Sequence, residues 1–217
     1  MDINSTTNII IPNAIKQTDS SIPRPISYAF EQGSNYSNIS SCMDKNPMVM
    51  INSSNHTSVA NEYINSIIER VAQWFLSLTP LSNKKLQKLC YYAYCWFIVF
   101  NNDLESIIDS DVQIQVLCAD RFQAWIHGPV CPRLYNKYKE YGWHDIPQVH
   151  PKPKVSKDLE SLLEQVWEAY GAFTADELEI ITHNEMPWKN ARKGYHKGDA
   201  CSNEISDYDI LRYYSNL

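Results

Sequence analysis

The chain has no cluster of glycines, no long apolar run and no concentration of positive charge. Only six of its 217 residues are glycines, and they are dispersed, so a glycine-rich loop that cradles phosphate groups is excluded. The longest apolar run, Leu89–Phe100, has twelve residues, fewer than the roughly 20 that cross a bilayer, so no membrane partner is expected. With 19 Lys and Arg against 25 Asp and Glu, the net charge is −6, which does not favour a nucleic-acid partner.

Metal and disulfide signatures are missing as well. The sequence has no Cys-x-x-Cys and no His-Glu-x-x-His motif, so we expect neither a metal nor a cofactor. Its six cysteines are scattered from Cys42 to Cys201, in a chain long enough to bury a core without disulfides. No export signal is apparent. We therefore expect reduced thiols and a cytoplasmic protein.

Composition divides the chain into two parts. Residues 1–57 contain 22 Ser, Thr or Asn, only seven charged residues and no Trp, whereas all six Trp lie between Trp74 and Trp188. A segment with so few large apolar side chains does not offset the entropy lost on ordering. We therefore expect a poorly ordered, low-complexity tail over residues 1–57 and one compact domain over residues 58–217.

In the second part, apolar residues recur with the 3.6-residue period of amphipathic helices. The pattern predicts about six helices: from Val59 to about Leu78, from Ser82 to about Phe100, from Pro132 to about Tyr141, from Ser156 to Gly171, from Thr174 to about Met186, and from Asp207 to Tyr214. The second of these is apolar on most sides, so we expect it at the centre. The predicted fold class is mainly α.

A minor β element is expected between residues 101 and 126. Apolar and polar residues alternate there from Val112 onward, and Phe122–Ile126 is rich in β-forming side chains. Gly128-Pro129 predicts a turn, and three prolines predict an extended connector over residues 147–154.

Two short segments concentrate residues that are hard to explain by packing alone. Phe122–Tyr135 holds a Trp, a His, a Gly-Pro pair and a helix start, and Thr182–Trp188 holds a polar cluster followed by Pro and Trp. Either the histidines orient turns through backbone hydrogen bonds and the tryptophans fill the core, or the segments form a recognition surface. For the second interpretation the candidate partner-binding residues are Trp125, His127, Gly128, Pro129, Pro132, Tyr135, Tyr138, His183, Glu185 and Trp188.

A small hydrolytic enzyme is a further alternative. Cys118 or Cys131 would then be activated by His127 or His183, because the fold brings such partners together without any fixed spacing. Free cysteine is among the most buried residue types, which favours a packing role for both thiols. We therefore expect no catalytic residues.

Three segments, taken in order, carry a family resemblance. Leu86–Trp96 is similar to the motif LQKLLYYAQAW, Phe122–Tyr135 to EAWxxGPVxPxLY, and Thr182–Trp188 to THxExPW. Together they resemble the Panacea-domain family of SocA-like and phage-associated GepA-like proteins, over about Glu62 to Tyr214. The chain departs from the pattern at Phe122-Gln123, where an acidic residue is common, and residues 1–57 have no counterpart in the family domain.

The resemblance implies an antitoxin of a bacterial or phage toxin–antitoxin pair, without catalytic activity. Such a protein neutralises a cognate protein toxin, encoded by an adjacent gene, by binding it. Some relatives deliver a client to a protease, so a proteolytic adaptor or another phage-encoded interaction protein remains the alternative. The helix from Pro132 would supply Tyr135 and Tyr138 as interface anchors, since tyrosine is enriched among the residues that carry binding energy.

Overall fold

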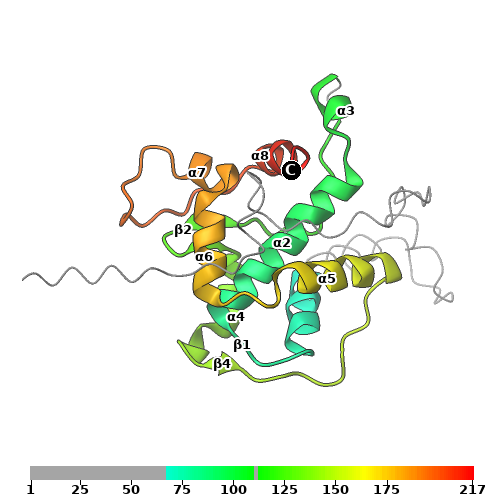
Figure 1. Cartoon of the computed structure of the whole chain (residues 1–217), viewed down its shortest axis with the longest axis vertical. Coiled ribbons are helices and arrows are strands. Elements are labelled where there is room, and N and C mark those ends of the chain that lie inside the picture. Colours follow the sequence, from blue (N-terminus) through cyan, green and yellow to red (C-terminus); the bar gives the residue numbers. More distant parts are fainter. Residues whose placement is uncertain (1–66, 110–111) are drawn as a thin grey trace, which may run out of the picture.

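The computed structural model describes residues 67–109 and 112–217. The predicted tail over residues 1–57 and the start of the first predicted helix lie outside the described residues. Within them the chain forms eight α-helices and two small antiparallel sheets of two strands each (Figure 1). The prediction of a mainly α fold with a minor β element is confirmed.

Helix α2 (Asn83–Asn101) lies at the centre, as its apolar pattern predicts. Ser82 caps its N-terminus, and fourteen of its residues are buried. Helices α5 (Lys157–Tyr170), α6 (Ala175–Asn184) and α8 (Asp207–Tyr214) pack around it (Figure 1). A helix apolar on most sides has to be surrounded in this way, because no face of it is suited to water.

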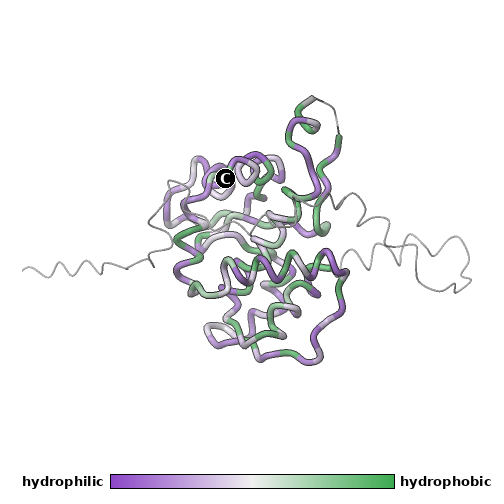
Figure 2. The backbone as a smooth tube through the Cα atoms, turned by 45° about the vertical axis from the view of Figure 1, so that its right-hand side comes forward, coloured by the Kyte–Doolittle hydropathy of each residue, from purple (hydrophilic) through white to green (hydrophobic). Residues whose placement is uncertain are grey.

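Capping residues begin the surrounding helices. The Ser156 hydroxyl accepts a hydrogen bond from a first-turn amide at the start of α5. Most of the apolar residues of this helix are buried. Hydrophilic and hydrophobic residues alternate along its backbone in Figure 2. Thr174 and Glu177 form a capping box at the start of α6. Ser206 caps α8 in the same manner.

The larger of the two strand pairs is a hairpin of β2 (Gln123–Trp125) and β3 (Gly128–Val130). The predicted turn at Gly128-Pro129 is therefore wrong, since the turn is formed by the two preceding residues. Gly128 has the positive φ of a turn residue, +95°, but pairs with Trp125 in the strand register. On its other side β2 bonds to residues 203–205, which leaves β3 at the edge, where a proline without an amide hydrogen is tolerated.

The alternating segment from Val112 does not form the expected strand. A short helix, α3 (Leu104–Asp109), precedes it and projects from the end of α2 (Figure 1). The Asn102 side chain accepts the amide of Gln115 at 2.7 Å and donates to its carbonyl at 2.9 Å. An amide side chain thus takes the place of a strand partner, and this pairing leaves no trace in hydrophobic periodicity.

A helix over residues 67–76 precedes all of these elements, and the remaining elements are helices α4 and α7 and a second pair of strands. Helix α4 (Pro132–Tyr138) continues as a 3-10 turn over Lys139–Tyr141, which matches the predicted helix. Helix α7 (Met186–Ala191) begins where only a break was predicted, because a proline fits the first turn of a new helix. Strands β1 (Leu81–Ser82) and β4 (Asp145–Ile146) form the second, unpredicted pair.

Candidate functional site

The three motif segments meet where the first half of α2, the hairpin and α6 pack together. Gly128 approaches both other segments: a β-carbon built on it would lie 2.6 Å from Lys88 Cε and 2.9 Å from Thr182 Oγ1. Contacts this short leave no room for a side chain, and the φ of +95° favours glycine as well. One residue from each motif therefore takes part in a single close contact, which fixes the hairpin on the helices.

Lys88 is fully buried beneath this hairpin. Its Nζ donates to the carbonyl of Pro129 at 3.1 Å, and no carboxylate among the described residues pairs with it. Burial lowers the pKa of Lys88 to about 7. Lys88 was not among the residues predicted from the sequence, although a lysine inside an almost continuous apolar helix is a visible signal.

Glu185 is the second buried charge-bearing group and comes from the third motif. Its Oε1 accepts the hydroxyl of Tyr92 at 2.8 Å, and its Oε2 accepts the hydroxyl of Tyr214 at 2.6 Å. Burial raises the pKa of the carboxyl to about 7, although the two hydrogen bonds act in the opposite direction. Glu185 thus joins the end of α6 to α2 and to α8.

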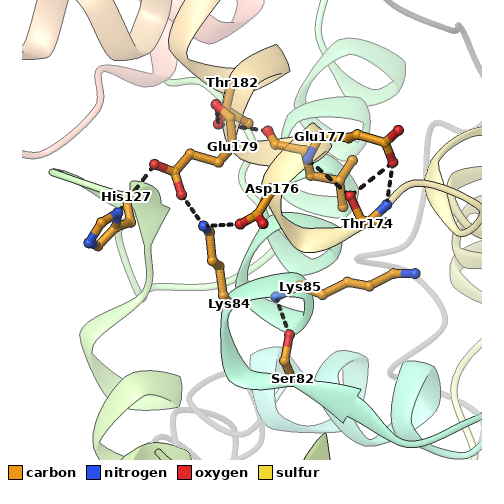
Figure 3. Close-up of polar contacts among 10 residues, drawn as sticks. Ser82, Lys84, Lys85, His127, Thr174, Asp176, Glu177, Glu179 and Thr182 are labelled. Atoms are coloured by element: carbon orange, nitrogen blue, oxygen red, sulfur yellow. Dashed lines mark hydrogen bonds and ion pairs between the residues drawn. The ribbon is translucent and has the colours of Figure 1, made fainter. Parts of the chain in front are cut away.

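An ion cluster lies at the surface beside the hairpin turn (Figure 3). Lys84 is 2.7 Å from Asp176 Oδ1 and also pairs with Glu179, while His127 Nδ1 lies 3.2 Å from Glu179 Oε1. Partial burial would raise the pKa of Glu179, but the hydrogen bonds from Lys84 and His127 outweigh it and lower the pKa. The partner of His127 is thus a side chain, and not the turn backbone that the packing interpretation assigned to it.

The ring of His183 likewise makes no hydrogen bond to the backbone within residues 67–109 and 112–217. Its ring stacks on Trp188 with centroids 4.1 Å apart, and its Nε2 is buried without a hydrogen-bond partner among the described residues. Burial lowers the pKa of His183 to about 4. The Trp188 indole donates to the carbonyl of Trp125 at 3.1 Å, which connects α7 to the hairpin.

The ten residues proposed from the sequence differ in their access to a partner. Four are buried, four are half-buried and only two are exposed. The buried ones are Gly128, Pro129, Tyr138 and Glu185; the half-buried ones are Trp125, Pro132, His183 and Trp188; the exposed ones are His127 and Tyr135. Tyr135 packs edge-on against Trp125 with ring centroids 4.8 Å apart. Four of the ten residues are therefore closed to a partner, four are partly accessible, and His127 and Tyr135 are well exposed.

The chemistry of a cysteine nucleophile does not fit this site. Burial raises the pKa of Cys131 to about 11 and that of Cys118 further, whereas an activated cysteine needs a lowered pKa. Residues 67–109 and 112–217 contain no group of three or more His, Cys, Asp or Glu side chains placed to hold a metal ion. No helix in that same part is long and apolar enough to cross a membrane.

Comparison with known proteins identifies the segment that carries the motifs. Residues 86–189 match the family model described as antitoxin SocA-like, Panacea domain. The matched segment begins at the first motif and ends one residue after Trp188, so it includes all three motifs. No curated protein and no solved structure gave a significant match to the chain. The resemblance drawn from the motifs is confirmed: residues 86–189 of this chain match the model of the SocA-like antitoxin, Panacea-domain family.

Proposed function

We propose that this protein is the antitoxin of a toxin–antitoxin pair and neutralises a protein toxin, encoded by an adjacent gene, by binding it directly. The observation that supports the proposal is the match of residues 86–189 to the SocA-like antitoxin family. The site geometry agrees with a binding role, because its buried motif residues fix the shape of a surface. They do not converge on a reacting centre with an activated nucleophile.

The surface proposed to contact the toxin is the exposed end of the hairpin with the adjoining face of α4. The His127 side chain is 68% exposed, and Tyr135 is 38% exposed on the neighbouring helix. The Trp125 ring packs edge-on against the Tyr135 ring and restricts its motion, so this side chain loses less conformational entropy when a partner binds. Specific interfaces concentrate binding energy in such aromatic anchors, surrounded by polar groups that exclude water.

Co-expression tests the proposal. The adjacent gene is expressed in a bacterial host alone and together with the full chain, growth is followed, and the co-expressed pair is captured through a tag on one partner. We expect growth arrest by the neighbour alone, rescue in company and recovery of a stable complex. A harmless neighbour, or rescue without any complex, contradicts the proposal.

The adaptor alternative makes a different prediction in the same cells. An adaptor shortens the half-life of the toxin in a protease-dependent way, whereas an antitoxin that acts by binding leaves the toxin intact in the complex. Toxin levels after translation is blocked, in hosts with and without their ATP-dependent proteases, separate the two. The hydrolytic alternative predicts that His183→Ala abolishes rescue while the complex still forms.

A further inference from the structure

The segment from Lys189 to Asp199, here called the basic loop, begins in the last turn of α7 and is folded around the guanidinium of Arg192. Arg192 Nη1 donates to the carbonyl of Ala124 in β2 at 2.9 Å, and Nη2 donates to the carbonyls of His196 at 3.2 Å and Asp199 at 2.7 Å. Only 6% of Arg192 is exposed. The basic loop therefore has a fixed conformation that is anchored to the hairpin of the second motif.

Two aromatic rings make cation–π contacts with the same guanidinium. It lies 5.0 Å from the ring of Trp188 and 5.9 Å from the ring of Tyr195. His183 also stacks on Trp188, so four side chains contact one another in series from α6 to the basic loop: His183, Trp188, Arg192 and Tyr195. Tyr195, at the outer end of this series, is 42% exposed. The basic loop thus presents a supported aromatic side chain to solvent.

Positive charge is concentrated on the basic loop. Lys189, Lys193 and Lys197 are exposed at intervals of four residues, and none forms an ion pair within residues 67–109 and 112–217. The single acid of the basic loop, Asp199, accepts the backbone amide of His196 at 2.8 Å. Four Lys or Arg therefore stand against one acid in a chain whose net charge is −6.

We propose that the basic loop is a docking site for an acidic segment of the partner protein. The proposal deepens the antitoxin function and rests on it, because the partner is then the toxin. The three ammonium groups would pair with its carboxylates around a contact centred on Tyr195, an arrangement that gives specificity and fast association. The open space beside Gly194 and Gly198 allows the partner backbone to approach closely.

The distribution of charge favours a protein over a nucleic acid as this partner. A polynucleotide carries negative charge along its whole length, so beyond the basic loop it would be repelled by a chain with a net charge of −6. A short acidic segment of a folded protein presents its charge only where the basic loop meets it. The basic loop is a small group of positive charges on an acidic chain, which fits a short acidic segment of a protein better than a polynucleotide.

The first test measures binding of the full chain to the purified toxin from the co-expression experiment. The variant carries Lys189→Glu, Lys193→Glu and Lys197→Glu. A matched control carries Lys139→Glu, Lys154→Glu and Lys157→Glu, which change the charge equally at exposed positions outside the basic loop. We expect at least tenfold weaker binding for the variant, a loss of most of its salt dependence, and a change of less than threefold for the control. Equal affinities for the two overturn the proposal.

A second test does not depend on the toxin. Fluorescence anisotropy follows a labelled peptide of eight glutamates and a labelled twenty-nucleotide oligothymidine, each titrated with the unaltered chain and both triple variants. Peptide binding that only the variant in the basic loop abolishes supports an acidic protein partner, even if the antitoxin proposal itself fails. Absence of peptide binding, or tighter binding of the oligonucleotide through the same lysines, overturns it.

Discussion

Gly128 lies so close to Lys88 that a β-carbon at position 128 would come within 2.6 Å of the lysine Cε. The glycine belongs to the hairpin and the lysine to the central helix, forty residues earlier in the chain. The lysine is fully buried and its Nζ donates to the carbonyl of Pro129, so a displacement of its end would disturb that hydrogen bond.

Gly128→Ala should be strongly destabilising. The positive φ alone costs about 1–3 kcal/mol, and the overlap with Lys88 adds to this cost. Gly194→Ala is the matched control, since its φ of +92° is almost the same but a β-carbon there meets open space. Urea unfolding should show a loss at position 128 larger by at least about 1 kcal/mol than the loss at position 194. Equal losses would mean that the close contact is not a constraint.

Glu185→Gln should change the pH dependence of stability. The folded-state pKa of about 7 lies above the ordinary value of 4.5, so the folded protein retains a proton that the unfolded chain releases between these values. The wild-type protein therefore loses stability from this group, about 3 kcal/mol, as pH rises from 4.5 through 7. The glutamine variant should gain on the wild type over that window.

Urea unfolding at pH 5 and pH 8 checks the prediction for Glu185. Glu164→Gln, on the exposed face of α5, controls for the loss of one carboxylate. If the difference between Glu185→Gln and the wild type is the same at both pH values, the carboxyl does not titrate between them.

Lys88→Met should show the opposite dependence. The folded-state pKa of about 7 lies below the ordinary value of 10.5, so between these values the unfolded chain binds a proton that the folded protein lacks. Wild-type stability from this group therefore rises as pH increases from 7 to 10.5. The methionine variant should be the more stable protein near pH 7, and its advantage should shrink by about 3 kcal/mol by pH 9.5. A constant difference in urea unfolding between these pH values would contradict the expected titration.

Arg192→Lys should loosen the basic loop while keeping its charge. A lysine lacks the planar fork that donates to three carbonyls at once, so we expect a loss of about 2–4 kcal/mol. Hydrogen exchange at the amides of Tyr195 and Asp199 should accelerate, because both bond within the basic loop. Lys193→Ala, at an exposed position, should change stability by less than about 0.5 kcal/mol. Unchanged exchange in Arg192→Lys would show that the guanidinium does not order the segment.

Tyr135→Ala should weaken toxin binding at least tenfold, which corresponds to about 1.4 kcal/mol, without lowering the thermal midpoint by more than a few degrees. Tyr141→Ala is the matched control, because Tyr141 is 39% exposed against 38% for Tyr135 but packs on Tyr138 and not on the hairpin. Calorimetric titration of both variants with the purified toxin checks this. Equal affinities for the two would place the interface elsewhere.

The elements that could be predicted from the sequence are those fixed by neighbouring residues in the chain. Ser82, Ser156 and Thr174 cap helices that begin where they were predicted to begin, since a hydroxyl that accepts a first-turn amide acts within four residues. The central position of α2 followed from its composition alone. These features need no information about the rest of the chain.

The features that were missed depend on distant partners. The pairing of Asn102 with Gln115 lies in a segment whose alternation predicted a strand instead, and the β1–β4 pair joins two-residue strands that carry little strand pattern of their own. Likewise, the sequence marked Glu185 as part of a motif but did not show that Tyr92 and Tyr214 donate to it. The roles of Lys88 and Arg192 depend on the carbonyls of Pro129 and Ala124 in the hairpin, which lie far from them in the sequence.

The position of Tyr214 shows that the packed structure extends beyond the segment that matches the family. The family match ends at residue 189, yet a tyrosine 25 positions further on supplies one of the two hydroxyls that satisfy the buried Glu185 carboxylate. The rest of α8 covers the central helix. A fragment cut at the boundary of the signature would expose that helix and strand a carboxylate in its interior, so the smallest fragment able to fold independently must extend through α8.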